Sequence, residues 1–322
     1  MKKLLILSIL VLLVIAIIIR FTDDSNYDMD NLVTNPSSNQ DQVIENKVQE
    51  IKHDIPDTTS PINNEILTTL EISRLIISKP EQILFRAGYV VSYNSDTKNP
   101  NWVAWHLTKE HTDGPYHRDG VPYYDEEGKA SGIGIVNNEN FKNPYFLDGD
   151  IESPKQEFRD WYDKRYHVNH GHLCPAGDNK WSKEAMNQSF YLSNMCPQDI
   201  DLNGGDWEGL EKRCRGWAKQ YDDLHIVAGP IFYGDQYRTM GEGNVGIPDA
   251  FFKVILRMKD IKGGENPKTL GFLFPNEGTH HDLINYLKTV DEIEEITGFD
   301  FFSDLPDSIE SVIEATGNLE LW

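Results

Sequence analysis

Three histidines and a cysteine lie close together in the stretch HVNHGHLC, from His167 to Cys174. Imidazoles and a thiol at this density could hold a zinc ion, or one imidazole could act as a catalytic base. Side chains alternate between the two faces of a strand, so His170, His172 and Cys174 would share a face and His167 would point away. The rest of the chain must decide between the two chemistries.

A zinc site is the first alternative. Structural zinc takes four nitrogen or sulfur ligands, usually supplied as two close pairs. The sequence offers no second pair of this kind, because Cys196 and Cys214 stand alone and three cysteines allow at most one internal disulfide. The segment from His106 to His111, HLTKEH, has one residue too many for the zinc-protease pattern HxxEH. A zinc protein stays open as an alternative that would require stoichiometric zinc.

Oxygen ligands for a harder cation occur further along the chain. Asn203 and Glu211 are separated by a little over two helical turns, so a helix that begins near Asn203 would bring both toward one side. An amide oxygen and a carboxylate suit Mg²⁺ better than zinc. The residue types therefore favour Mg²⁺ over zinc at this place.

Three ordered blocks resemble the DNA/RNA non-specific endonucleases, the ββα-metal (His-Me finger) nucleases that include the endonuclease G type. The family pattern D-R-G-H with L-x-P-A corresponds to Asn169–Ala176, S-N-x-x-P-Q to Ser193–Gln198, and L-N-x-G-x-W-x-x-L-E to Leu202–Glu211. The resemblance extends from about Ile83 to the C-terminus. It implies an α+β fold with a central, mainly antiparallel sheet flanked by helices, and a sugar-non-specific endonuclease that cleaves DNA and RNA.

The resemblance also implies roles for individual residues. His172 corresponds to the general base, Asn203 to the ligand of Mg²⁺ (for which Mn²⁺ could substitute), and Glu211 to the residue that orients the metal's water. Asn194 occupies the position that supports the site. Arg118 is the best match to an upstream arginine that contacts phosphate.

One departure from the family pattern concerns the pair Asn169-His170, which replaces Asp-Arg. We expect His170 to take the place of a phosphate-contacting arginine. A histidine is charged only below a pH of about 6.5, so the replacement predicts weaker phosphate stabilisation and an acid-shifted optimum. It also leaves open a catalytically weakened, nucleic-acid-binding protein on a membrane tether.

The charge of the chain weighs against a nucleic-acid substrate. The formal net charge is −22, from 52 acidic and 30 basic residues, and such a chain repels a polyanion at long range. Binding would therefore need a local basic patch. The candidates all lie within the motif region: Lys164, Arg165, Lys180, Lys183, Lys212, Arg213 and Arg215.

The N-terminus predicts export. Lys2 and Lys3 precede an apolar run from Leu4 to Ile19, which is typical of a signal peptide or signal anchor over residues 1–20. Residues 21–80 are rich in polar residues and predict a disordered tether, and residues 81–322 predict the catalytic domain. We expect a membrane-anchored enzyme with its catalytic domain outside the cytoplasm, or a secreted or periplasmic one if the segment is cleaved.

The remaining pattern predicts the elements that position the site. Helical spacing covers 207–221, a short helix is expected over 183–191, and FRDWYDKRY is expected to be helical. Two amphipathic segments, 280–298 and 305–317, close the chain. The predicted strands are 82–94, 101–109, 224–232, 251–258 and 269–275. Strands and helices do not alternate one for one, which favours α+β.

Overall fold

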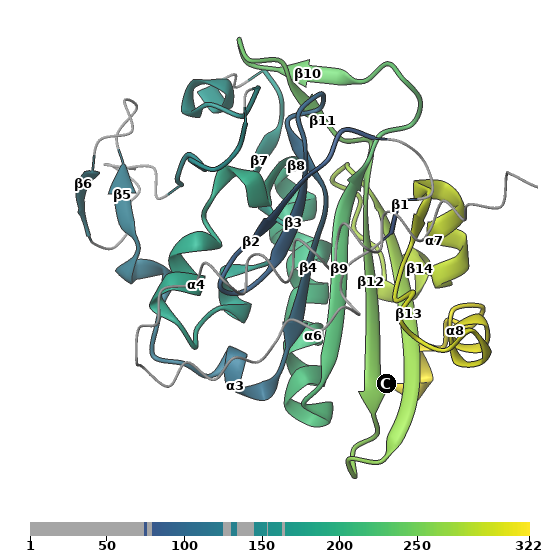
Figure 1. Ribbon diagram of the computed structural model, residues 1–322. Helices are drawn as coiled ribbons and strands as arrows, with labels where there is room; N and C mark the ends of the chain where they lie inside the picture. Colours follow the sequence, from purple (N-terminus) through teal and green to yellow (C-terminus); the bar gives the residue numbers. More distant parts are fainter. Residues whose placement is uncertain (1–73, 76–78, 125–129, 134–144, 153, 163–164) are drawn as a thin grey trace, which may run out of the picture. The chain divides into compact units, whose positions relative to one another are not determined.

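The computed structural model describes residues 74–75, 79–124, 130–133, 145–152, 154–162 and 165–322, all within the unit Glu65–Trp322. These residues form a seven-stranded antiparallel sheet (Figure 1). Its order across the sheet is β14 (Leu287–Lys288), β13 (Glu265–Pro275), β12 (Ala250–Lys259), β9 (Leu224–Ile231), β4 (Asn99–Leu107), β3 (Val90–Asn94) and β2 (Gln82–Phe85).

Both faces of the sheet are covered. Alternate side chains of a strand point to opposite faces, so Phe251 packs into one hydrophobic cluster and its neighbour Phe252 into the other. The central strand β12 is buried along most of its length for this reason. A strand that is covered on both faces reads as a continuous apolar run.

Helix α6 (Glu208–Tyr221) covers the first face. Leu210, Cys214 and Trp217 recur at helical spacing and are buried against the sheet. The left-handed residue Asp222, with φ of 56°, ends the helix. The other face is covered by α7 (Val290–Thr297) and α8 (Asp307–Ile313) (Figure 1).

A separate ββα unit carries the histidine motif. Strand β7 (Val168–His172) pairs antiparallel with β8 (Met195–Asp199), and the chain then enters α5 (Ile200–Leu202). The Asp199 side chain accepts hydrogen bonds from the N–H groups of Asp201 and Leu202 and caps this helix. The chain then passes through the turn η6 (Asn203–Trp207), which is kinked at Gly205, into α6.

Smaller elements complete the described chain. Short antiparallel pairs are β1 (Arg74–Leu75) with β15 (Phe299–Asp300), β5 (Pro122–Tyr124) with β6 (Ala130–Ile133), and β10 (Arg238–Met240) with β11 (Val245–Ile247). Two further helices are α3 (Lys109–Thr112) and α4 (Lys183–Gln188). The 3-10 helices are η2 (Arg118–Gly120), η3 (Phe158–Tyr162), η4 (Ala176–Asp178), η5 (Leu192–Asn194), η7 (Leu283–Tyr286) and η8 (Leu319–Leu321).

The predicted α+β architecture is confirmed, with local differences. The strand predicted over 82–94 divides in two, because the chain turns at Arg86 and its N–H bonds back to the carbonyl of Tyr89 at 2.8 Å. The amphipathic segment 280–298 is α-helical only from Val290. Arg74 and Leu75 form a strand within the range of the predicted tether. The apolar run Leu4–Ile19 lies outside the described residues.

Candidate active site

His172 is the last residue of β7, and a close approach of two strands fixes its backbone. A Cβ atom at the preceding Gly171 would lie 2.5 Å from the Gln198 side chain on β8. Only glycine fits so close to the partner strand. The glycine before His172 therefore allows β7 to lie against the strand that leads into the helix.

Asn194 fixes the loop that follows His172. Its Oδ1 accepts from the N–H of Cys174 at 3.0 Å, and its Nδ2 donates to the carbonyls of Cys174 and Ser189, both at 2.8 Å. The side chain is fully buried. Its amide is thus occupied by the backbone, so Asn194 can position His172 but offers no donor to a substrate.

The imidazole of His170 lies in an aromatic stack. Its ring is 3.9 Å from that of Tyr145 and 3.8 Å from that of Trp161, with interplanar angles of 8° and 16°. Burial, with the nearby charge of Arg118, lowers the pKa of His170 to about 3. A stacked and desolvated imidazole favours its neutral form, so this environment opposes the positive charge that the sequence predicted for His170 in mild acid.

Arg118 lies beside the histidines, as the resemblance implied. Its guanidinium donates to the Tyr145 hydroxyl at 3.3 Å and lies 5.3 Å from the centre of the Phe190 ring. Its charge lowers the pKa of both His170 and His172. The residue is exposed, so a positive charge lies near the two histidines at a place that solvent reaches.

The His172 imidazole is neutral and unsatisfied. Burial, followed by the charge of Arg118, lowers the pKa of this histidine well below its usual value. Its ring packs edge-on against Phe190, with centroids 5.1 Å apart. Within the described residues, its Nε2 atom is buried and has no hydrogen-bond partner. A buried nitrogen of this kind is costly unless it has a ligand or a substrate to meet.

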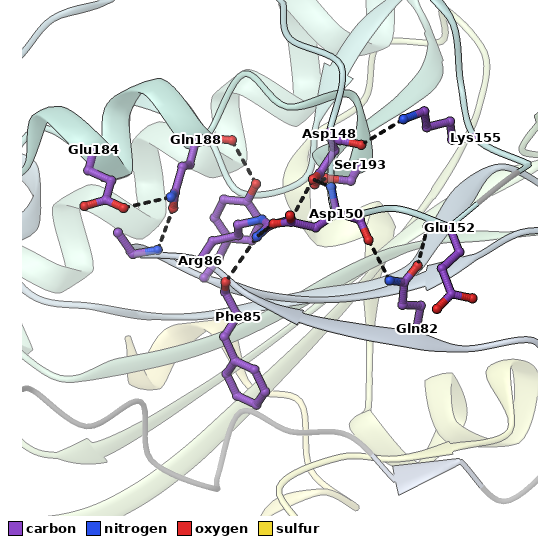
Figure 2. Close-up of polar contacts among 12 residues, drawn as sticks. Gln82, Phe85, Arg86, Asp148, Asp150, Glu152, Lys155, Glu184, Gln188 and Ser193 are labelled. Carbon is purple, nitrogen blue, oxygen red and sulfur yellow. Dashed lines mark hydrogen bonds and ion pairs between the residues drawn. The ribbon is translucent and has the colours of Figure 1, made fainter. Parts of the chain in front are cut away.

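An ion-pair network places the segment that carries Tyr145. Arg86 donates to Asp148 at 2.7 Å and to Asp150 at 2.8 Å, and Ser193 donates to Asp148 (Figure 2). Ser193 precedes Asn194, so the same carboxylate holds both the Tyr145 segment and the Asn194 loop. Asp148 and the Arg86 side chain are almost fully buried, which makes the pair costly to break.

The kinked turn η6 carries Asn203. The indole N–H of Trp207, the last residue of the turn, donates to the carbonyl of His172 at 3.1 Å and so ties the turn to the end of β7. The Asn203 side chain is half-buried and makes no hydrogen bond within the described residues. An amide oxygen that is held in place and unpaired fits a metal ligand.

A kink separates Asn203 from Glu211. Gly205, with φ of −111° and ψ of −105°, leaves helical geometry between Asn203 and α6, the helix that carries Glu211. The outer side of the turn is held by Asp206, which accepts from the Tyr286 hydroxyl at 2.6 Å and from the His281 N–H at 3.1 Å.

Glu211 lies in a buried charge cluster. Burial raises its pKa to about 7, Lys253 and Arg215 oppose this shift, and Asp178 adds to it. The Lys253 ammonium is buried and lies 4.1 Å from the centre of the Trp207 ring. Glu211 is therefore poised between its two protonation states near neutral pH, which suits a residue that orients water.

The placement of the cysteines does not favour the zinc alternative. Cys174, Cys196 and Cys214 are buried and free, so no internal disulfide forms among them. Within the described chain, the clusters that could hold a metal do not include His170, His172 or Cys174. Cys174 packs in the core, and the exposed His167 points away and pairs with Asp199 at 3.3 Å.

The predicted basic patch is only partly available. Arg215 donates to the buried Asp178 at 2.9 Å, and Lys212 pairs with Glu208 at 2.9 Å. Lys180 is half-buried, whereas Lys183 and Arg213 are exposed. Lys164 lies outside the described residues, and Arg165 is exposed next to the Tyr166 ring. A fixed pair such as Arg215–Asp178 supports the helix rather than a phosphate.

Sequence reasoning missed three side chains that shape the site. Tyr145 comes from an irregular segment, and Trp161 comes from the segment FRDWYDKRY, which the sequence predicted as a helix but not as part of the site. Lys253 had a signal, because it interrupts the apolar run AFFKVILRM of a central strand. A buried charge in such a run requires a partner.

A histidine at the end of the first strand and an unpaired amide on the following helix define an α+β nuclease of the ββα-metal type. The chain belongs to the DNA/RNA non-specific endonuclease family, which matches residues 69–308. This confirms the predicted family and the predicted class of enzyme, an endonuclease. A chain of the crystal structure of the EndoG/EndoGI complex superposes with a TM-score of 0.60 at 21% identity, over 77% of this chain and 94% of that one.

Several mitochondrial nucleases are similar in sequence. The chain is 30% identical to the human "Nuclease EXOG, mitochondrial" over 68% of its length and 56% of the relative's. It is 29% identical to the "Mitochondrial nuclease" of Saccharomyces cerevisiae over 69% of its length and 66% of that protein's. The match thus spans little more than half of the EXOG relatives.

The prediction of an exported or membrane-anchored protein is wrong. The curated relatives include mitochondrial nucleases from vertebrates and yeasts. Among the residues placed in the structure, no helix has the length and apolar character needed to cross a bilayer.

Proposed function

We propose that this chain, through a catalytic domain over residues 81–322, hydrolyses phosphodiester bonds of DNA and RNA with the help of a divalent cation. The observation that carries the proposal is the His172 imidazole, which is neutral, lacks a hydrogen-bond partner for Nε2 among the described residues, and lies beside Arg118. A free base next to a fixed cation can meet a water molecule and a phosphate at the same time.

The residues present fit a hard divalent cation. Asn203 offers an amide oxygen with no partner in the described chain, and Glu211 adds a carboxylate on α6, the helix that follows the kinked turn of Asn203. We propose that these residues serve Mg²⁺, with Mn²⁺ able to substitute, because both cations prefer oxygen ligands. When bound, such a cation neutralises the charge that builds up on the phosphate.

His172 takes the proton from the attacking water in this proposal. The pKa of this histidine is lowered by burial and by Arg118, so the imidazole is unprotonated and ready at neutral pH. A phosphate anion beside the ring favours its protonated form and raises the pKa when the substrate binds. Arg118 remains charged throughout and holds the phosphate.

Substrate breadth follows from what the site can contact. Arg118 recognises phosphate, which DNA and RNA share, and phosphate contacts carry no base information. Lys183 and Arg213 are exposed and could extend the contact along the backbone. The overall negative charge of the chain makes such local cations necessary.

One observation favours a second candidate, a nucleic-acid-binding protein with weak activity. The neutral His170 leaves no charge at a position where the family has arginine. Digestion of plasmid and RNA separates the two candidates. We expect cleavage with Mg²⁺, none with EDTA, and a loss of about 10²- to 10⁴-fold in His172→Ala.

His167→Ala is the matched control, because His167 belongs to the same segment but is exposed and paired with Asp199. It should cleave like the wild type. A wild-type protein that retards both substrates in a gel and leaves them intact with Mg²⁺ and with Mn²⁺ would favour the binding protein.

A further inference from the structure

A group of acidic side chains lies on the face of the sheet opposite α6. Asp291 and Glu294 are one turn apart on α7, and Glu314 follows α8. One carboxylate oxygen from each of the three lies within 4.8 Å of the others. Glu314 also lies beyond residue 308, where the match to the nuclease family ends.

The backbone holds these side chains together. The Glu314 carbonyl accepts from the N–H of Val290 at 3.1 Å and of Asp291 at 3.4 Å, which joins the end of α8 to the start of α7. The Phe301 N–H donates to one oxygen of Glu294 at 2.8 Å. The fold thus brings the three residues together, and a backbone N–H fixes the carboxylate of Glu294.

Glu314 is the unusual member of the group. Its residue is 3% exposed, and its Oε1 is buried without a hydrogen-bond partner in the described part of the chain. Burial, and then the carboxylates of Glu294 and Glu310, raise its pKa to about 9. A buried carboxylate among other carboxylates destabilises the fold unless a proton or a cation neutralises it.

Another acidic residue with histidine neighbours shows the contrast. Asp223 accepts from Lys259 at 3.2 Å and contacts His106 at 2.9 Å and His225 at 3.4 Å. Its charge is already matched by side chains. The three carboxylates around Glu314 differ from Asp223, because they still require a proton or a cation to neutralise them.

We infer that Asp291, Glu294 and Glu314 form a binding site for Ca²⁺. The three oxygens lie within 4.8 Å of one another, so a point exists no more than about 2.8 Å from each, which is compatible with Ca²⁺–oxygen distances of about 2.3–2.6 Å. Calcium accepts an irregular set of oxygen ligands, whereas magnesium requires a near-ideal octahedron. The bound ion joins α7 to the end of α8 and stabilises the cover of this sheet face.

Thermal unfolding of the full chain with and without CaCl₂ tests the site, with Asn203→Ala as the background so that the nuclease centre does not contribute. We expect Tm to rise by roughly 3 to 5 °C for each tenfold excess of calcium over its Kd. The same concentration of MgCl₂ should produce a smaller rise. Glu314→Gln should abolish the calcium effect and leave nuclease activity in the otherwise wild-type chain unchanged.

Asp291→Asn provides a second test at an exposed position, where folding is not at risk. It should weaken the calcium response. The inference is overturned if calcium leaves Tm unchanged, or if both variants respond as their background does. A rise in Tm on acidification but not on addition of calcium would also overturn it, because the carboxylates would then hold a proton.

Discussion

The imidazole of His170 lies face to face with the indole of Trp161, with ring centroids 3.8 Å apart. Tyr145 covers the other face of the imidazole, and its hydroxyl accepts from Arg118. In the family pattern an arginine occupies the position of His170. Here His170 packs between two aromatic rings, and the nearby positive charge belongs to Arg118.

The stack makes stability depend on pH. The pKa of His170 is about 3 in the folded chain and about 6.5 when unfolded, so the unfolded state binds more protons between these values. The contribution of the neutral imidazole is fully present above the unfolded pKa and is lost as pH falls through this window. We expect Tm to fall less steeply with acid in His170→Phe, which keeps an aromatic ring and cannot titrate.

His167→Phe is the control for this comparison, because His167 is exposed. Its Tm should follow the wild-type curve. Parallel curves for wild type and His170→Phe would show that His170 is solvated and that the stack does not hold it neutral.

Arg118 should be visible in the salt dependence of binding. Each phosphate that a protein neutralises on duplex DNA contributes about 0.9 to the slope of log K against log salt. In a His172→Ala background, which prevents cleavage, Arg118→Gln should lower that slope by about this amount, as measured by fluorescence anisotropy with duplex DNA. Arg118→Lys keeps the charge and should keep the slope; a slope unchanged in Arg118→Gln would remove Arg118 from the phosphate site.

The helix of the site was predictable because packing repeats along it. Leu210, Cys214 and Trp217 recur at helical spacing, and a helix buries such a stripe wherever it lies. The course of the turn kinked at Gly205 was not predictable, because Asp206 in this turn is held by Tyr286, some 80 positions along the chain.

The charge of His170, a residue of the motif, was not predictable either. His170 reads as a titrating histidine by type, but burial lowers its pKa, and the rings of Tyr145 and Trp161 that stack on it could not be assigned to the site from the sequence. Arg215 reads as a candidate phosphate contact, but it is used by the buried Asp178. Motif spacing thus locates a site, whereas long-range contacts set its electrostatics.

Asn194 should matter for stability and for kcat. Asn194→Ala leaves the N–H of Cys174 and two carbonyls without partners in a fully buried place. Each unsatisfied buried group costs about 1–3 kcal/mol, so we expect a loss of several kcal/mol in urea unfolding. Because the loop after His172 is released, kcat should fall more than KM changes.

Asn285→Ala is the control for Asn194→Ala. At its exposed position it should unfold like the wild type. Similar values for both variants would contradict the role of Asn194.

Lys253 should set the protonation of Glu211. Burial raises the pKa of Glu211 to about 7, and Lys253 is the strongest of the groups that oppose this shift. Lys253→Met removes the opposing charge, so the pKa of Glu211 rises further and the ionised form is reached only at higher pH. If the ionised carboxylate orients the water, the rising limb of kcat/KM against pH should move toward alkaline pH in Lys253→Met.

Lys259→Met is a matched control on the same strand, because Lys259 pairs with Asp223 instead. An unshifted limb in a folded Lys253→Met protein would show that Glu211 does not act in its ionised form.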